Sequence, residues 1–499
     1  DDSVTLPLSG AINESILRHE DARTAPTPED FRRAVKATAG STHENRLPKT
    51  ILIPSWLVYD KGDFSHQGTA ITAWEENDRS GILAIATGGG KTITSLIAAA
   101  RLSAEKSPLL LLIAVPTKPL FTQWCEEVED FGLTAPFGPD STRKVKFEES
   151  ENCAKRLFYG VSSVEVIILT IDLLCDSDFQ NLIRSYQLPT MLIADEVHNF
   201  ATQRFLENAP SWIRYRLGLS ATPVKQYDEE GTKELFDYFS GGTVFEFSLE
   251  EAIGNCLTEY DYFLHPVELS LDEMDKWVTL SEKIRKAFQG RGDVPTSEED
   301  SIIQALLNRR RKIIETAEQK LEILRDLLES LPQQDLDHTL IYATDKDPEQ
   351  LLKVGDLLND LGVSFHQVTQ EETRNSAQLK SIIDTFRSRD LSVLTAKRVL
   401  DEGFNVPEIK RAFILASTTT TKQWTQRRGR VLRKCKDKTN AEIHDFLVLP
   451  PAEDFVDEGT RKLVRGELKR CEEFARLSRN QFSANGSSEI LNDARIRFS

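Results

Sequence analysis

The sequence predicts an α/β protein made of two tandem lobes, each with a parallel sheet that helices cover on both faces. Two series of short apolar runs alternate with helical patterns, and a mostly helical segment, residues 245–331, separates the two series. This alternation is typical of parallel sheets, because every return to the same edge of the sheet needs a crossover helix. The length, 499 residues, exceeds what one hydrophobic core usually holds, which also favours two lobes.

The limits of the predicted parts follow from where each pattern begins and ends. We expect an N-terminal accessory segment, a first lobe, a helical arm, a second lobe and a C-terminal helical tail, at residues 1–50, 51–244, 245–331, 332–450 and 451–499. The sequence assigns no function to the first and last of these parts. Because the chain begins at Asp1 without an initiating Met, we expect a fragment or a processed chain that lacks an upstream domain.

Composition argues against several classes of protein. The hydrophobic and charged fractions, 39% and 28%, are typical of a globular chain, and no apolar run approaches the ~18 residues of a membrane span. Six scattered cysteines without a C-x-x-C pair predict neither a zinc site nor a disulfide framework. Since no signal pattern is present, we expect a cytoplasmic protein without membrane contact.

The net charge, −17, argues against a protein that coats nucleic acid by bulk attraction. A basic groove on an acidic body is still compatible with this charge. Basic residues cluster at 309–312, 427–438 and 461–470. Taken alone, each cluster favours a solvated helix face over a nucleic-acid contact.

The first lobe is organised around residues 82–102, which predict a strand, a glycine-rich loop and a helix. The loop and the first helical turn consist of Thr87, Gly88, Gly89, Gly90, Lys91 and Thr92. Glycines let backbone N–H groups close on phosphate oxygens, and the helix N-terminus adds unpaired donors. We therefore expect a nucleotide site in which Lys91 reaches the outer phosphates and the Thr92 hydroxyl holds Mg²⁺.

Two features of this stretch leave alternatives open. The full phosphate-loop pattern has glycine where this chain has Ile85, and a glycine-rich loop before a helix is more often a mere turn. Gln67, shortly before the loop, offers a donor and an acceptor together, which can read the edge of adenine. A polar residue at the start of a helix explains Gln67 equally simply.

Polar residues follow the other predicted strands of the first lobe. They lie at the carboxyl ends of the strands, where ligands bind in parallel sheets of this kind. These strands are expected at 109–115, 164–170, 190–194 and 216–219. The third strand delivers Asp195 and Glu196 side by side. One carboxylate can hold Mg²⁺, and its neighbour can orient and deprotonate an attacking water. Adjacent acids are usually plain surface, but surface acids seldom follow a buried strand so abruptly.

Three further residues in this region are candidates for coupling. The hydroxyls of Ser220 and Thr222, at the end of the fourth strand, are able to link the carboxylates to movement. His198 by itself favours a structural role.

The second lobe repeats the alternation without a phosphate loop. Its strands are expected at 338–343, 363–368, 391–395, 411–416 and 442–448. Arg430 and Arg433 lie three residues apart on a predicted helix and hence on one face. Arginines so placed can stabilise charge on a transferring phosphoryl group, although a basic helix surface explains the spacing about as well.

Taken together, these segments resemble the superfamily 2 helicases of DExH type, the group that includes XPB-like and restriction-enzyme-like motors. About eight motifs occur in the family's order between Gln67 and Arg433. The resemblance implies two RecA-like P-loop NTPase lobes with ATP in the cleft between them. It implies that Gln67 reads adenine, that Lys91 and Thr92 bind phosphates and Mg²⁺, and that Asp195 and Glu196 are the metal and water carboxylates.

The resemblance also assigns roles outside the first-lobe nucleotide site. It implies that His198, Ser220 and Thr222 couple hydrolysis to movement. The second lobe would complete the ATP site with Glu402, Gly403, Gln426, Arg430 and Arg433, the two arginines acting as fingers. Nucleic acid would cross the top of both lobes near Thr117, Lys118, Thr170, Tyr342 or its neighbours, and Thr395, through contacts that carry little sequence information.

The chain departs from the family pattern at two places. Phe64, Ser65 and His66 stand where an arginine or tyrosine often precedes the glutamine, and Asn405 stands where an acid is usual. The aromatic residue that stacks on adenine is open, with Trp56 and Tyr59 as candidates.

The resulting functional hypothesis is an ATP-dependent DNA helicase or translocase, a nucleic-acid-dependent ATPase that uses ATP and Mg²⁺. The stretch after the first lobe, 227–263, resembles that of XPB-like and restriction-type motors, which favours DNA. The alternatives are an ATP-switched nucleic-acid sensor that recruits an effector or nuclease partner, and an RNA helicase. The type of motor, together with the acidic and cytoplasmic character of the chain, suggests a role in antiviral defence or restriction.

Overall fold

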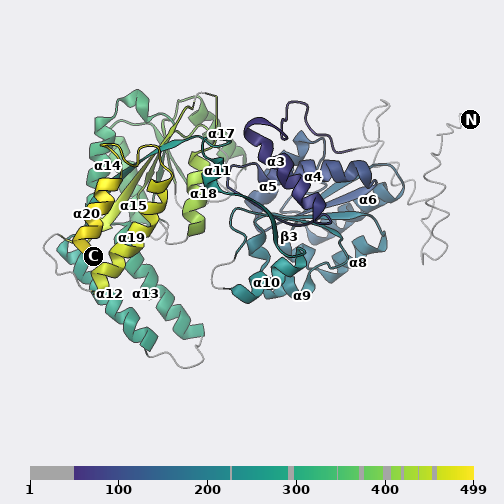
Figure 1. The fold of residues 1–499 in the computed structure, drawn as a ribbon, viewed down its shortest axis with the longest axis horizontal. Helices are drawn as coiled ribbons and strands as arrows, with labels where there is room; N and C mark the ends of the chain where they lie inside the picture. The colour runs from purple at the N-terminus through teal and green to yellow at the C-terminus, as the bar shows by residue number, and fades with distance from the viewer. Residues whose placement is uncertain are drawn as a thin grey trace, which may run out of the picture. The chain divides into compact units, whose positions relative to one another are not determined.

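The computed structural model describes residues 50–224, 228–289, 297–344, 347–369, 372, 376–396, 406–416, 421–436, 438–451 and 458–498. The chain divides into two compact units, Asp1–Ser248 and Leu249–Ser499. Each unit holds one parallel sheet, of six strands among the described residues, with helices around it (Figure 1). The predicted α/β class with two RecA-like lobes is therefore confirmed.

The strands of the first unit are β1 (Ser80–Ile85), β2 (Leu109–Val115), β3 (Val164–Thr170), β4 (Thr190–Ala194), β5 (Tyr215–Ser220) and β6 (Thr243–Phe247). Its helices are η1 (Gly62–Phe64), α3 (Ser65–Glu76), α4 (Lys91–Glu105), α5 (Lys118–Asp130), α6 (Arg143–Phe158), α7 (Ile171–Leu174), α8 (Ser177–Ser185), η2 (Val197–Phe200), α9 (Gln203–Asn208) and α10 (Glu229–Tyr238). In Figure 1, α3 and α4 lie on one side of the sheet and α9 and α10 on the other.

The first sheet has the order β3-β2-β4-β5-β1-β6, and all of its strands are parallel. Strands β1, β2 and β4 are buried along their whole length, which explains why they are unbroken apolar runs rather than alternating ones. Because the strands are parallel, the residues that follow β1, β2, β3, β4 and β5 meet at one edge of the sheet.

The strands of the second unit are β7 (Tyr260–Glu268), β8 (Thr339–Tyr342), β9 (Phe365–Val368), β10 (Val393–Ala396), β11 (Arg411–Ile414) and β12 (Ala441–Leu449). Its helices are α11 (Leu249–Ala252), α12 (Leu271–Gln289), α13 (Ser297–Glu315), α14 (Gln319–Ser330), η3 (Gln333–Leu336), α15 (Pro348–Asp360), α17 (Ser376–Arg387), α18 (Thr421–Val431), α19 (Glu458–Arg476) and α20 (Ser488–Phe498). The sheet order is β7-β12-β11-β8-β10-β9, again all parallel.

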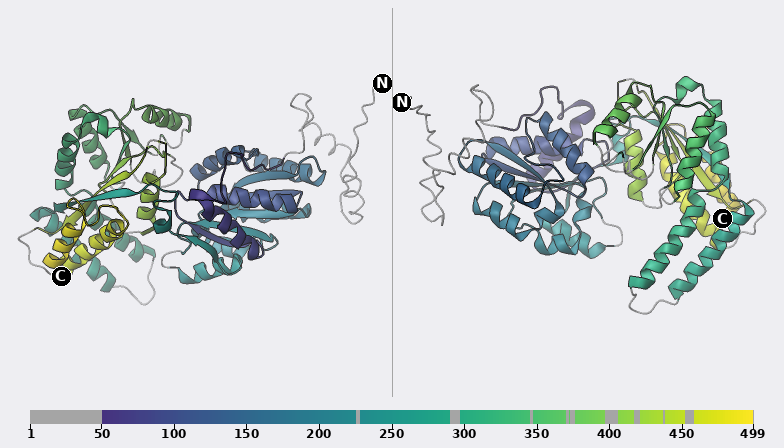
Figure 2. Two further views of the ribbon diagram at one scale, coloured as in Figure 1. Left: turned by 45° about the horizontal axis from the view of Figure 1, so that its top comes forward. Right: turned by 180° about the vertical axis from the view of Figure 1, so that it is seen from behind.

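The segment expected to be a helical arm is only partly an arm. Its residues 260–268 form β7, the edge strand of the second sheet, and Leu324 and Leu328 of α14 belong to the same buried core as Ile341 and Phe413. Helices α12 and α13 lie side by side and project away from the second sheet (Figures 1 and 2). The projecting part is thus a helical pair, while β7 and α14 build the second unit itself.

Several basic residues expected on solvated helix faces are buried instead. Arg428 is 2% exposed, and it bonds to the Tyr260 hydroxyl and to both the carbonyl and the carboxylate of Glu473. Arg470 is 2% exposed and pairs with Asp445 and with Glu467. These side chains hold the second unit together and are not available to a ligand.

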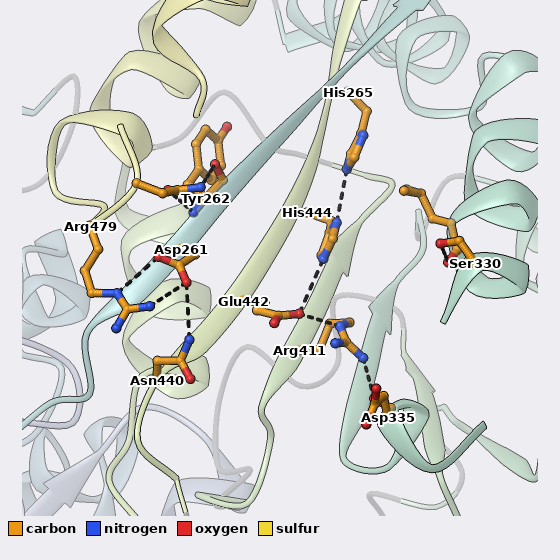
Figure 3. A network of polar contacts seen from close by, with 12 residues as sticks. Asp261, Tyr262, His265, Ser330, Asp335, Arg411, Asn440, Glu442, His444 and Arg479 are labelled. Atoms are coloured by element: carbon orange, nitrogen blue, oxygen red, sulfur yellow. Dashed lines mark hydrogen bonds and ion pairs between the residues drawn. The ribbon is translucent and has the colours of Figure 1, made fainter. Parts of the chain in front are cut away.

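A line of polar side chains crosses β7, β12 and β11 in the second sheet (Figure 3). His265 Nε2 lies 3.1 Å from His444 Nδ1, and His444 Nε2 lies 3.8 Å from Glu442 Oε2. Arg411 then donates from Nε to Glu442 Oε2 at 2.7 Å. Near the start of the edge strand β7, Asp261 pairs with Arg479.

Among the helices that the structure describes, none has both the length and the apolar character needed to cross a membrane.

Candidate nucleotide site

The glycine-rich segment forms a tight loop between β1 and α4. Gly88 and Gly90 have φ values of 89° and 84°, a left-handed region that favours glycine. A Cβ on Gly89 would lie 2.7 Å from Ile85 Cγ2, and one on Gly90 would lie 2.3 Å from Gln67 Nε2. Helix α4 begins at Lys91, and the first turn of a helix leaves N–H groups without an intrahelical partner. The first turn of α4 therefore offers backbone donors to an anion, whereas the Gly89 N–H is donated within the loop to the Ala86 carbonyl oxygen at 2.9 Å.

Two buried oxygens near the loop have no hydrogen-bond partner among the described residues. Gln67 is 1% exposed and Thr87 is 8% exposed, and the unpaired atoms are Gln67 Oε1 and Thr87 Oγ1. An unpaired buried polar atom costs about 1 to 3 kcal/mol, so such atoms commonly mark the place of a bound group. The residues present thus fit a nucleotide, with Gln67 on the side of the loop where Gly90 lies.

The predicted carboxylates lie directly after β4. Asp195 is 5% exposed, and its Oδ2 accepts from Trp124 Nε1 at 2.8 Å while its Oδ1 accepts from the Glu196 N–H at 2.8 Å. Glu196 has φ 45°, the left-handed region, and its Oε1 lies 3.7 Å from Lys91 Nζ. The structure therefore brings Lys91, Asp195 and Glu196 together, as expected.

The surroundings of Asp195 disfavour the charged form of its carboxyl group. Burial, followed by the neighbouring charge of Glu196, raises the pKa of Asp195 to about 6, and Lys91 opposes this shift. A divalent cation beside Asp195 would favour the ionised form, which is the behaviour expected of a metal-holding carboxylate. The fit to Mg²⁺ rests on this buried carboxylate and on the Thr92 hydroxyl at the start of α4.

The three coupling candidates form a continuous chain of contacts with Glu196. His198 Nδ1 lies 3.5 Å from Glu196 Oε2 and 3.0 Å from Ser220 Oγ. Ser220 Oγ in turn accepts from the Thr222 N–H at 3.1 Å. The chain of contacts runs from the end of β4 to the residues after β5.

The second-unit candidates are only partly described. Arg430 lies in the last turn of α18, but the helix ends at Val431, and Arg433 lies beyond it in an isolated bridge to Leu257. The prediction that both arginines share a helix face is therefore wrong, because the chain leaves the helix before Arg433. Glu402 and Gly403, together with Asn405, lie outside the described residues, as does the side chain of Gln426.

The nucleic-acid candidates fall into two groups. Thr117 and Thr170 follow β2 and β3, at the same sheet edge as Asp195, and the exposed Lys118 pairs with Asp140 at 2.5 Å. Tyr342 and Thr395, in contrast, are 1% and 0% exposed. Neither side chain is accessible to a phosphate, which contradicts the prediction for these two residues. The Tyr342 ring instead lies under the guanidinium of Arg427, at 5.0 Å.

Sequence reasoning missed three residues at the site. Trp124 holds Asp195, and nothing in the sequence links residues 71 positions apart. His66 contacts the loop at the Gly89 carbonyl oxygen, and Phe247 stacks on His66. The one available signal was the unusual histidine before Gln67.

Comparisons with known proteins show which families the chain resembles. The family described as "Type III restriction enzyme, res subunit" matches residues 61–225, and the family "Helicase conserved C-terminal domain" matches residues 319–435. Together the two matches cover more than half of the chain. A relative, the DNA 3'-5' translocase XPB2 of Sulfurisphaera tokodaii, is 26% identical over 403 residues, which are 77% of this chain and 82% of that protein.

Solved structures show the same fold. The helicase domain of Hef from Pyrococcus furiosus is 16% identical with a TM-score of 0.51, over 77% of this chain and 94% of that one. The DNA-bound type ISP restriction-modification enzyme LlaBIII is 16% identical with a TM-score of 0.55, over 88% of this chain. The chain spans only 33% of LlaBIII.

Fold and site define a P-loop NTPase with two RecA-like lobes, in which a phosphate loop and a carboxylate pair meet at one sheet edge. The order and extent of the two family matches identify the kind of NTPase. The chain belongs to the superfamily 2 helicases. As such it is a nucleic-acid-dependent ATPase.

Proposed function

We propose that this chain is an ATP-dependent DNA helicase or translocase that uses Mg²⁺. The single observation that carries the proposal is the contact set of Lys91, Asp195, Glu196 and His198 beside the glycine loop. This set has the groups that phosphoryl transfer to water requires: a cation for the outer phosphates, a metal-holding carboxylate and a base. The name of the relative XPB2, a DNA translocase, supports DNA as the track.

Each residue then has one task in hydrolysis. Lys91 and the loop N–H groups bind the β- and γ-phosphates, and Gln67 recognises adenine through its unpaired carbonyl oxygen. Mg²⁺, held by Asp195 and Thr92, would neutralise charge on the phosphate oxygens. Glu196 orients the attacking water and takes its proton.

Transmission of hydrolysis follows the contacts of the carboxylate. The left-handed backbone of Glu196 presents its side chain toward both Lys91 and His198. Loss of the γ-phosphate changes what Lys91 and Glu196 pair with, and His198 passes this change to Ser220. Arg430 and Arg433 of the second unit act on the developing phosphate charge, and Thr117, Lys118 and Thr170 contact the nucleic-acid backbone. We also include Glu402, Gly403 and Gln426 among the residues that act on ATP.

The proposal also includes a partner protein and a cellular role. Because the first family match is to a restriction-enzyme subunit, we include an effector or nuclease partner and a role in restriction or defence. This part rests on that description alone.

The test compares ATP hydrolysis by the wild type with single-stranded DNA, duplex DNA, RNA or no polynucleotide at one low salt concentration. Stimulation by DNA above RNA is expected, and Lys91→Ala and Glu196→Gln should each reduce the rate at least a hundredfold. Glu207→Gln, at the exposed end of α9, is a matched control that should hydrolyse ATP normally.

Three outcomes would overturn parts of this proposal. Hydrolysis that survives in both site variants would contradict the assignment of the site. Stronger stimulation by RNA would favour the RNA helicase. If the chain binds ATP but does not progressively displace a DNA strand or a roadblock on the DNA, the ATP-switched sensor is favoured.

A further inference from the structure

His66 contacts the phosphate loop directly. Its Nε2 lies 2.7 Å from the Gly89 carbonyl oxygen, and because a carbonyl oxygen can only accept, Nε2 is the donor. His66 is 8% exposed, so this hydrogen bond is shielded from water. The bond joins the second residue of α3 to the centre of the loop that precedes α4.

The orientation of the bonded peptide has a consequence for the loop. In a planar trans peptide the C=O and the N–H point in opposite directions. Holding the Gly89 oxygen toward His66 therefore directs the Gly90 N–H to the opposite side of the loop. Because glycines flank this peptide on both sides, it could otherwise turn over at little steric cost. The His66 bond thus selects one of two available orientations.

Phe247 supports His66 from the other side. The two rings lie flat on one another, with 3.9 Å between centroids and 5° between planes. The Phe247 carbonyl oxygen also accepts from the Ala86 N–H at 2.9 Å, at the start of the loop. A Cβ on Gly89 would lie 3.6 Å from Phe247 Cδ1. Phe247 therefore contacts both the loop and the histidine that holds it.

We propose that His66 is a positioning residue for ATP hydrolysis, which fixes the Gly89–Gly90 peptide so that the Gly90 N–H faces the phosphate site. This proposal rests on the proposed function of the loop as the ATP site. His66 touches neither substrate nor the reacting atoms, and it acts only through the backbone of Gly89. Phe247 sets the plane of the histidine ring.

The test separates the hydrogen bond from the stacking. His66→Phe keeps a flat ring for Phe247 and removes the donor, whereas His66→Gln places an amide nitrogen as many bonds from Cβ as Nε2 and gives up the ring. We expect kcat/KM for ATP to fall about tenfold in His66→Phe, mostly through KM, and to recover largely in His66→Gln. A merely structural role predicts the reverse order, because His66→Gln loses the stacking.

A second measurement tests the loop without nucleotide. Hydrogen exchange of peptides that cover residues 86–94 should become faster in His66→Phe and stay near the wild-type rate in His66→Gln. His66→Met, which has the length of glutamine and no donor, repeats the comparison if the phenylalanine variant does not fold. Equal exchange and equal kcat/KM in the donor and non-donor variants would overturn the proposal.

Lys91→Ala distinguishes this proposal from the one on which it rests. If Lys91→Ala hydrolyses ATP like the wild type, the loop is not the ATP site and the proposed function fails. If Lys91→Ala is inactive while His66→Phe keeps both the wild-type KM and the wild-type exchange, only the role of His66 fails.

Discussion

The stacked histidines of the second sheet should make the stability of the second unit depend on pH. Burial, followed by the neighbouring His444, lowers the pKa of His265 to about 4 from an ordinary value of 6.5, and burial also lowers the pKa of His444. The rings are parallel within 2°, with Phe446 beside them. A proton on either ring would therefore place a charge among aromatic side chains.

The sign and size of the effect follow from these values. Below pH 6.5 the unfolded chain takes up a proton at His265, but the folded chain does so only near pH 4. A depressed histidine pKa thus means that stability falls as pH falls through this window. A full pH unit corresponds to at most about 1.4 kcal/mol, and His265 is half protonated in the unfolded chain at pH 6.5, so between pH 6.5 and 4.5 the second unit should lose about 2 kcal/mol. Glu442, whose pKa lies at about 2, stays ionised over this range.

The perturbation is His265→Phe, which keeps a flat ring against His444 and cannot be protonated. Urea unfolding is measured at pH values from 7.5 to 4.5, and the unfolded fraction is sampled by a brief protease pulse at pH 7. Peptides from residues 260–268 are then quantified, so that the result reports the second unit. The loss of stability with falling pH should be about 2 kcal/mol smaller in the variant than in the wild type. Equal losses in the two proteins would refute the reasoning that His265 is held neutral.

Three further predictions concern single contacts. Trp124→Phe should lower kcat for ATP about tenfold by removing the donor to Asp195. Trp74→Phe, in which an equally buried tryptophan loses its indole bond to the Arg216 carbonyl, should leave the steady-state rate unchanged. Gly90→Ala should weaken ATP binding at least tenfold in a nucleotide titration, because φ is 84° and the new methyl would meet Gln67; wild-type affinity would show that the loop rearranges freely. Arg428→Met should cost roughly 3 kcal/mol in urea unfolding, because it removes the hydrogen bonds of a buried guanidinium to Tyr260 and to the carbonyl and carboxylate of Glu473. The surface pair lost in Arg479→Met should cost less than about 1 kcal/mol.

The sequence predicts the central strands well because burial on both faces makes them unbroken apolar runs. Strands β2, β3 and β4 have the predicted limits. The two strands that were missed, β6 and β7, are edge strands with polar residues in them. Strand β7 even contains Pro266, which an edge strand tolerates because proline lacks the N–H for a further partner. Local pattern alone therefore could not identify either strand.

The site was predictable where side chains follow a buried strand directly. Asp195 and Glu196 are such residues, and their contact with Lys91 follows from the parallel order of the strands. Tyr342 and Thr395 were misassigned because they belong to strands β8 and β10 themselves and point into the unit. His66 was not assigned a role because its partner, a backbone carbonyl 23 residues away, leaves no trace in the sequence.

The edge position of β6 has a consequence for how the first unit is made. Strand β6 pairs with β1, and Phe247 at its end contacts the loop, yet it lies more than 150 residues further along the chain. A nascent chain therefore completes the support of its nucleotide loop only after the ribosome has passed residue 247. For the same reason, a truncated gene for the first unit that stops near residue 225 would encode every described strand of this unit except β6, which carries Phe247. Recombinant fragments of this unit should extend through Ser248.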